Sequence, residues 1–265
     1  MGIIGGRVGY RILRFIAPQT QPSSRDTDQE KSDTKLEQFF GNDFLNLIKD
    51  KVVIDFGCGT GSQSVEMAQK GAKKVIGIDI QERLLEHGRQ SAKQFGVGER
   101  CVFARNTDEL ADIVISKDAF EHFSNPAEIL ELMSRSIKPE GYVLAAFGPT
   151  WLHPFGGHLF SVFPWSHLIF TESSQIKWRS DFKSDGATRF SEVAGGLNQL
   201  TISKFEKIVA NSPFRFEWME TVPIKGVALL KTRMLREIGS SIVRCKLKLK
   251  ENLGTKVGRH LIGSN

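Results

Sequence analysis

The residues with the clearest chemical potential surround a glycine-rich turn. Asp55 is followed by three alternating glycines, Gly57, Gly59 and Gly61, and Asp79 ends the next apolar stretch of the chain. Glycine backbone lets a ligand approach closely. An acidic side chain at the end of a strand is suited to accept both hydroxyls of a ribose. Because a carboxylate beside the turn repels a pyrophosphate and attracts a cation, these residues predict a site for a positively charged nucleoside.

An open parallel sheet is needed to bring these residues together. The short β-branched runs 52–54 and 75–78 are typical of buried parallel strands, and 62–70 reads as the helix between them. Dinucleotide sites space their glycines G-x-G-x-x-G, whereas the spacing here is G-x-G-x-G. S-adenosylmethionine carries a sulfonium, an amine and a ribose but no phosphate, and it fits this arrangement.

The stretch Asp55-Phe56-Gly57-Cys58-Gly59-Thr60-Gly61 resembles the first motif, D/E-x-G-x-G-x-G, of the class I S-adenosylmethionine-dependent methyltransferases. Within that family it is similar to the small-molecule "type 11" group. The resemblance implies S-adenosylmethionine as the cofactor. It also implies a set of cofactor-binding residues: Asp55, Gly57, Cys58, Gly59, Gly61, Asp79, Ile80, Asn106, Thr107, Lys117 and Asp118.

The rest of the chain predicts an α/β fold of the same kind. Further strands are expected at 101–104, 111–116, 142–147, 214–222 and 242–249, and a helix at 36–48. Together they predict a doubly wound, mostly parallel seven-stranded sheet with an antiparallel last strand.

Three parts are expected along the chain. Residues 1–35 read as a flexible basic segment and linker, 36–250 as the methyltransferase domain, and 251–265 as a basic tail. Within the domain, the aromatic-rich stretch 148–200 reads as a cap inserted after the fifth strand, where it would cover the methyl donor.

Three histidines are candidates for a general base. His158 and His153 lie in the expected cap, and His122 belongs to a Glu-His pair that follows the fourth strand, as in the family's fourth motif. A base is needed only if the acceptor must lose a proton, so each histidine retains the alternative of a packing role. His153, His158 and His167 lack the spacing of a helical zinc pair, and no metal site is expected.

The composition of the chain limits the cellular locations and the binding partners that we expect for it. The 265 residues include only three cysteines, widely separated, which predicts reduced thiols and a cytoplasmic location. No apolar stretch is long enough to span a membrane. Basic residues concentrate at the two ends of the chain, a pattern that makes a nucleic-acid groove unlikely and leaves peripheral contact with a membrane surface open.

These observations favour a methyltransferase that moves a methyl group to a small-molecule, sugar or lipid-linked acceptor by in-line displacement. Two alternatives stay open at this point. One is a non-catalytic module that binds S-adenosylmethionine and regulates a partner. The other is an RNA or protein methyltransferase that docks through its basic ends.

Overall fold

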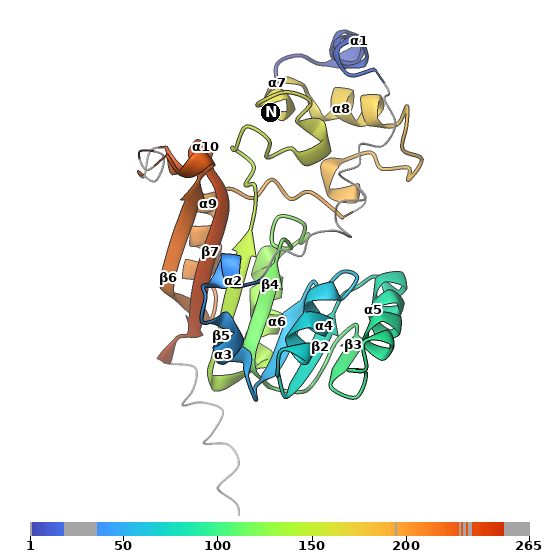
Figure 1. Ribbon diagram of the computed structural model, residues 1–265. Helices are drawn as coiled ribbons and strands as arrows, with labels where there is room; N and C mark the ends of the chain where they lie inside the picture. The colour runs from blue at the N-terminus through green and yellow to red at the C-terminus, as the bar shows by residue number, and fades with distance from the viewer. Residues whose placement is uncertain are drawn as a thin grey trace, which may run out of the picture.

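Figure 1 shows the computed structural model, which describes residues 2–18, 36–193, 195–227, 229, 232 and 235–251. A seven-stranded sheet has the order β3-β2-β1-β4-β5-β7-β6. The strands are β1 Val52–Phe56, β2 Lys74–Ile78, β3 Cys101–Ala104, β4 Ala111–Lys117, β5 Ile137–Phe147, β6 Phe214–Pro223 and β7 Ser240–Leu249. Because β7 runs antiparallel to both β5 and β6 and the first five strands are parallel, the predicted fold class is confirmed.

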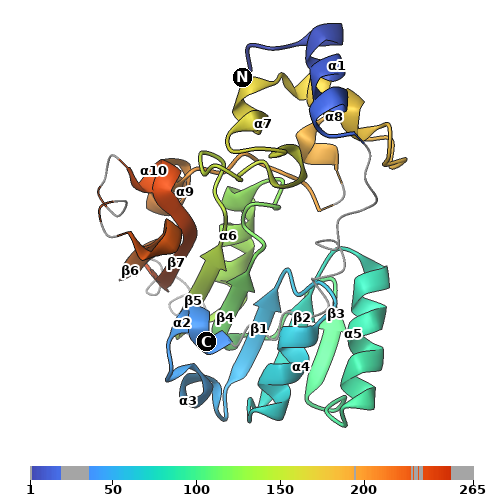
Figure 2. The same cartoon turned by 45° about the horizontal axis from the view of Figure 1, so that its top comes forward.

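Helices cover both faces of the sheet (Figure 2). One face packs on α6 and α9 through Leu130, Met133 and Phe205, and the other packs on α2 to α5 through residues such as Phe44 and Leu85. The helices of these layers are α2 Leu36–Phe40, α3 Phe44–Ile48, α4 Ser62–Gln69, α5 Glu82–Gln94, α6 Pro126–Arg135 and α9 Ile202–Ala210, and α10 Arg236–Gly239 precedes β7. The single helix expected over 36–48 is two short helices, because Gly41 between them has a φ of +98°, which ends α2.

The stretch 148–200 rises beyond the carboxyl ends of the strands (Figure 1). It contains α7 Ser166–Ile169, α8 Glu172–Arg179 and short 3₁₀ turns at His158–Phe160 and Phe190–Glu192. Its aromatic residues, including Trp151, Phe160 and Phe190, form a core of their own. This segment, here called the cap, therefore has its own packing beside that of the sheet.

The N-terminal residues differ from the flexible segment expected for 1–35. Helix α1, Gly6–Ile16, packs on α8, and backbone hydrogen bonds join Ile3 to Ile169 and Thr171 to Ile4 at 2.8 and 2.9 Å. Gly9 is buried in this contact, where a Cβ would lie 2.8 Å from Oγ of Ser174. Tertiary packing thus offsets the weak helix propensity of the glycines. Residues 19–35, the expected linker, and 252–265, the expected tail, lie outside the described residues.

The predictions of reduced cysteines and of no membrane-spanning segment can be compared with the structure. Cys58, Cys101 and Cys245 are free thiols. Among the residues that the structure describes, none of the helices has the length and apolar character needed to cross a bilayer.

The packing of α1 makes a first prediction. Gly9→Val is expected to detach α1 from α8, because the new side chain overlaps Ser174 and the carbonyl oxygen of Ile4, at a cost of about 1–3 kcal/mol. Hydrogen exchange should then lose protection over 6–16 while the sheet keeps its protection. Val8→Ala, at an exposed position of the same helix, is the control. Equal protection in all three proteins would contradict this role for Gly9.

Candidate functional site

The glycine turn is pinned to the carboxyl end of β2. The backbone N–H groups of Gly57 and Cys58 both donate to the carbonyl of Ile78, at 2.8 and 3.0 Å. Gly57, Gly59 and Gly61 have φ values of +82°, +53° and +79°, which other residues adopt only with strain. At Gly61, a Cβ would lie 2.3 Å from the ring of Phe103, so this position excludes any side chain.

Asp79 braces the same turn. Its carboxylate accepts hydrogen bonds from the backbone N–H of Gly59 at 3.0 Å and of Gln81 at 2.9 Å. Each carboxylate oxygen has a second lone pair, so the half-exposed Asp79 retains capacity for ribose hydroxyls. Ile80, next in the chain, is 84% exposed. The ribose contact itself stays a prediction.

Asp55 is buried at the floor of the turn, where it accepts a hydrogen bond from the hydroxyl of Ser64 at 2.6 Å. Burial raises the pKa of Asp55 to about 6, against the lowering effects of Ser64 and Lys117, and the nearby Asp79 adds to the rise. A positive ligand stabilises the charged form of a carboxyl group that burial and a neighbouring carboxylate disfavour. The turn therefore suits a cation, as the sequence predicts.

The remaining predicted cofactor residues lie at the ends of β3 and β4. Asn106 and Thr107 follow β3 in an open loop, where the Thr107 hydroxyl accepts the N–H of Glu109. Lys117 is buried, with its Nζ bonded to the carboxylate of Asp118 and 4.5 Å from the centre of the Phe39 ring. Since Lys117 and Asp118 engage each other, their contact with a cofactor remains a prediction.

The turn after β4 abuts the glycine turn directly. A Cβ on Gly57 would lie 2.8 Å from Cβ of Ala119, so the glycine permits the contact. Glu121 and His122 follow Ala119 by two and three residues in the same turn. From the cap, His158 approaches His122 with a ring-to-ring distance of 5.2 Å.

Glu121, His122 and His158 form one polar cluster, called here the EHH cluster. One ligand-capable atom of each lies within 4.8 Å of the others. Glu121 is 3% exposed; its Oε1 accepts the N–H of Gly148 at 3.0 Å, whereas its Oε2 is buried without a partner. Nε2 of His158 is also buried without a partner. Nδ1 of His122 lies 2.9 Å from the carbonyl oxygen of Gly196.

Burial shifts the charge states within the EHH cluster. Desolvation raises the pKa of Glu121 to about 8, and it lowers the pKa of His158 to about 4 with help from His122 and two further histidines. Both groups are therefore mainly neutral near pH 7. An imidazole with so low a pKa is a weak proton acceptor.

The other cap histidines have structural partners. Nδ1 of His153 accepts the N–H of Phe155 at 3.0 Å, and His167 binds Ser161 and the carbonyl oxygen of Trp151. Of the predicted catalytic histidines, the structure thus brings together His122 and His158 and leaves His153 outside the EHH cluster. Sequence reasoning did not select Glu121 as a site residue, although the Glu-His pair after the fourth strand was the available signal.

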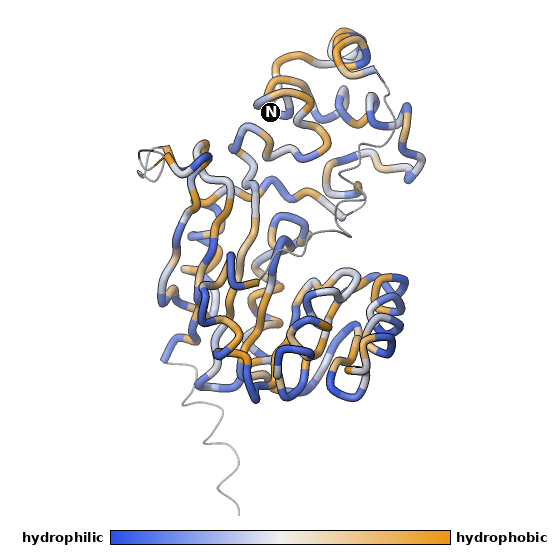
Figure 3. The backbone as a smooth tube through the Cα atoms, in the orientation of Figure 1, coloured by the Kyte–Doolittle hydropathy of each residue, from blue (hydrophilic) through white to orange (hydrophobic). Residues whose placement is uncertain are grey.

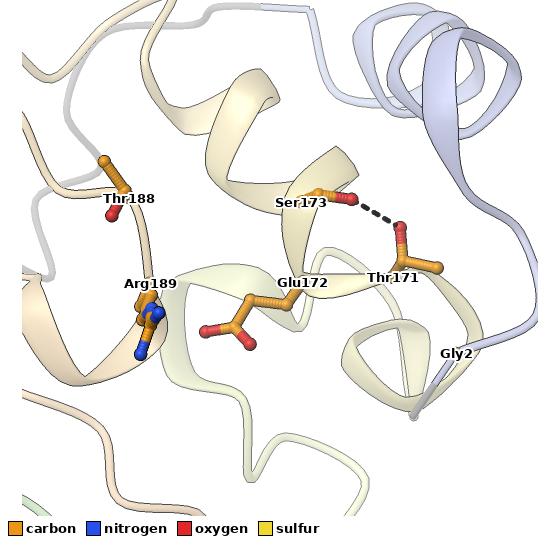
Figure 4. Close-up of a pocket in the computed structure, with 6 residues that line it drawn as sticks. All are labelled: Gly2, Thr171, Glu172, Ser173, Thr188 and Arg189. Atoms are coloured by element: carbon orange, nitrogen blue, oxygen red, sulfur yellow. Dashed lines mark hydrogen bonds between the residues drawn. The ribbon is translucent and has the colours of Figure 1, made fainter.

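Two pockets lead from the outer cap toward the EHH cluster. The outer pocket, about 430 Å³, is lined by Gly2, Thr171, Glu172, Ser173, Thr188 and Arg189 (Figure 4). The inner pocket, about 280 Å³, is lined by His122, Ser124, Glu172, Arg189, Ser191, Leu197, Asn198 and Gln199. Glu172 and Arg189 belong to both, so the two pockets adjoin and the inner one reaches His122.

The pKa of Glu121 makes a second prediction. A carboxyl whose folded pKa is about 8 and whose unfolded pKa is about 4.5 stabilises the fold fully below pH 4.5, and this contribution is lost as pH rises through 8. Glu121→Gln removes the ionisation but keeps an acceptor for Gly148. The difference in free energy of unfolding, variant minus wild type, should rise by about 4 kcal/mol between pH 5 and pH 9 in buffer with EDTA. Denaturant titrations at both pH values test it. A pH-independent difference would show that Glu121 ionises normally.

Comparison with known proteins agrees with this geometry. Residues 47–149 match a family described as "Methyltransferase domain". Ribosomal protein L11 methyltransferase of Haemophilus influenzae (strain PittEE) is 33% identical over 95 residues, which cover 36% of this chain and 32% of that protein. Ubiquinone biosynthesis O-methyltransferase of Neisseria meningitidis serogroup C (strain 053442) is 33% identical over 103 residues, covering 36% of this chain and 43% of that protein. The chain thus matches less than half the length of these relatives.

A solved structure of a SAM-dependent methyltransferase from Aquifex aeolicus has a TM-score of 0.50 and 14% identity, over 87% of this chain and 100% of that one. At this identity the likeness concerns the fold alone. The sheet order, the glycine turn and the family match agree, and they show that residues 47–149 belong to an S-adenosylmethionine-dependent methyltransferase domain.

Proposed function

We propose that this chain transfers the methyl group of S-adenosylmethionine to a hydroxyl of a small, lipid-associated acceptor beneath the cap. The observation that carries the proposal is the direct contact between the glycine turn and the turn after β4. The contact supports a cofactor site near the EHH cluster, whose polar atoms are suited to an acceptor hydroxyl. The inner pocket gives the acceptor access at His122.

The reaction is an in-line displacement. The acceptor oxygen forms a bond to the methyl carbon, the carbon–sulfur bond breaks, and its electron pair stays on sulfur. The sulfonium becomes a neutral thioether, S-adenosylhomocysteine, and the hydroxyl proton is released. Since the leaving group is good, most of the rate comes from holding the two reactants in line in a dry site.

The outer surface of α1 supports a lipid-associated acceptor. Val8, Ile12, Phe15 and Ile16 follow the i, i+4, i+7, i+8 spacing of one helical face. This face is solvent-exposed, with Val8 64% and Phe15 85% exposed, and Ile3 adds to it at 90%. Figure 3 shows the hydrophobic character of α1 at the outer end of the cap.

Charge next to this face favours a membrane as its occupant. Arg7, Arg11 and Arg14 lie exposed on the adjacent side of α1. An apolar stripe flanked by arginines is the pattern of a helix that lies in the interface of an anionic bilayer. Gly2, just before α1, also lines the outer pocket. The outer pocket therefore lies near the start of α1 and adjoins the inner pocket at His122, which supports entry of a lipid-associated acceptor from the membrane side.

The alternatives have less support. The L11 methyltransferase acts, by its name, on a ribosomal protein, but its match covers only 36% of this chain and does not favour a protein acceptor here. A regulatory module that only binds S-adenosylmethionine would need neither the pockets nor the EHH cluster.

The cofactor assignment makes a third prediction. Asp79→Ala should weaken S-adenosylmethionine binding by about 1–3 kcal/mol, or roughly 5- to 150-fold in Kd, because charged hydrogen bonds to ribose and the brace on Gly59 are both lost. Titration calorimetry measures the effect. Asp50→Asn, before the amino end of β1, is the matched control. Tight binding of NAD without binding of S-adenosylmethionine would overturn the proposed function.

The membrane face makes a fourth prediction. The double variant Val8→Ser, Phe15→Ser should bind phosphatidylglycerol-containing liposomes at least tenfold more weakly than the wild type, since each exposed apolar side chain contributes about 1–2 kcal/mol when buried in lipid. Phe95→Ser, which replaces an exposed aromatic residue on the sheet body, should bind as the wild type does. Liposome flotation of the wild type, the double variant and Phe95→Ser measures these differences in membrane binding.

Neutral liposomes should bind the wild type more weakly than anionic ones, because the arginines lose their counter-charges. Equal flotation of wild type and double variant would remove the membrane from the proposal. A wild type that is dimeric in gel filtration, with a monomeric double variant, would instead assign this face to a second copy of the chain.

A further inference from the structure

We propose that the EHH cluster is a binding site for a divalent transition-metal cation, with Glu121, His122 and His158 as its protein ligands. The proposal starts from two buried polar atoms that have no partner, Oε2 of Glu121 and Nε2 of His158. Buried polar atoms are nearly always hydrogen-bonded, so two unpartnered ligand-type atoms in one cluster need an explanation. Glu121 is 97% buried, which makes solvation by bulk water a poor one.

The third ligand is prepared for coordination by its neighbour. Nδ1 of His122 lies 2.9 Å from the carbonyl oxygen of Gly196. A carbonyl oxygen only accepts hydrogen bonds, so Nδ1 carries the proton and Nε2 presents a lone pair. Metal-binding histidines usually donate their second ring nitrogen to a carbonyl or carboxylate in this way, which fixes the tautomer and the ring orientation.

Glu121 is oriented by the backbone in the same manner. Its Oε1 accepts the N–H of Gly148, which leaves Oε2 as the oxygen available to a cation. Asn198 holds the turn that carries this residue, with its side-chain amide donating to the carbonyls of Phe120 and Phe123 at 2.6 and 2.8 Å. Two of the three ligands are thus fixed by second partners.

The donor set indicates which cation fits. Two imidazoles and one carboxylate suit Zn²⁺, Co²⁺, Fe²⁺ or Mn²⁺ better than Ca²⁺ or Mg²⁺, which prefer oxygen ligands. Three protein ligands leave at least one position open, as in catalytic rather than structural zinc sites. The ligand atoms span up to 4.8 Å, whereas tetrahedral ligands about 2.1 Å from zinc are roughly 3.4 Å apart. The cluster therefore has to contract by up to about 1.4 Å around the cation. The His158 ring, whose Nε2 has no hydrogen-bond partner, can turn toward the other two ligands while its backbone stays in the cap.

The consequence for the reaction rests on the proposed function. Held by Glu121, His122 and His158, the cation would supply Lewis acidity to an acceptor hydroxyl and so ease the loss of its proton to solvent in the inner pocket beside His122. The acceptor oxygen would then bond to the methyl carbon as the carbon–sulfur bond breaks. We therefore infer a hydroxyl acceptor, because an alcohol gains much nucleophilicity when its proton is lost, whereas the free-base form of an amine attacks without such activation.

The test uses the full chain after treatment with EDTA. Added Co²⁺ should give visible ligand-field absorption with a one-to-one endpoint, and calorimetry should give the same stoichiometry for Zn²⁺. Glu121→Gln, His122→Ala and His158→Ala should each weaken Co²⁺ binding at least tenfold. His87→Ala, which removes an exposed imidazole on α5, should bind Co²⁺ as the wild type does.

Binding without saturation at one equivalent, or variants that all bind like the wild type, would overturn the metal site. S-adenosylmethionine binding is measured in parallel in the metal-free protein. Normal cofactor binding without a one-to-one cation refutes only this inference, whereas one-to-one cation binding without affinity for S-adenosylmethionine refutes the proposed function. Where a variant unfolds, circular dichroism identifies it, and the remaining two decide the outcome.

Discussion

The structure depends on close contact between the glycine turn and the strand ends on either side of it. Gly61 and Gly77 both face the ring of Phe103, and Gly57 faces Ala119 of the β4 turn. Each contact is too close for a Cβ, so glycine is required at three separate points for the loop to lie flat on the sheet. The flat loop lies against the end of β2 on one side and against the β4 turn on the other.

The strands and helices of the sheet body could be predicted from the sequence, because their signals lie in neighbouring residues. The runs that became β1 and β2 are short, β-branched and bounded by glycine or an acidic residue. Helix α6 likewise begins at a local signal, with Asn125 as its N-terminal capping residue and Pro126 in its first turn. Such signals depend on neighbouring residues and need no knowledge of the fold. Gly41 is a counterexample, because the apolar pattern around it continues while its backbone conformation ends the helix.

The cap side was less accessible from sequence, because its structure depends on contacts between distant residues. Leu13 completes a core whose other members come from the cap, and Trp178 donates to the carbonyl of Ala17. No local pattern shows that α1 belongs there. The same holds for Glu121, whose importance comes from burial by the cap and from a missing partner. His153 illustrates the same limit, since its place in an aromatic segment resembles that of His158, yet its Nδ1 accepts a neighbouring backbone N–H and it lies outside the EHH cluster.

The EHH cluster takes two of its members from the sheet body and one from the cap. His158 has a φ of +51°, and the Gly156-Gly157 pair before it packs against Thr150 and His167, so its backbone is held within the cap. A site divided in this way is complete only while the two parts stay together. A ligand that binds EHH residues from both parts also stabilises the cap against the sheet body. By thermodynamic reciprocity, any contact that stabilises this position of the cap raises the affinity of the EHH cluster for its ligand. If α1 binds a bilayer, the membrane becomes an effector of the EHH cluster. The affinity of the chain for the membrane and the affinity of the cluster for its ligand then increase or decrease together.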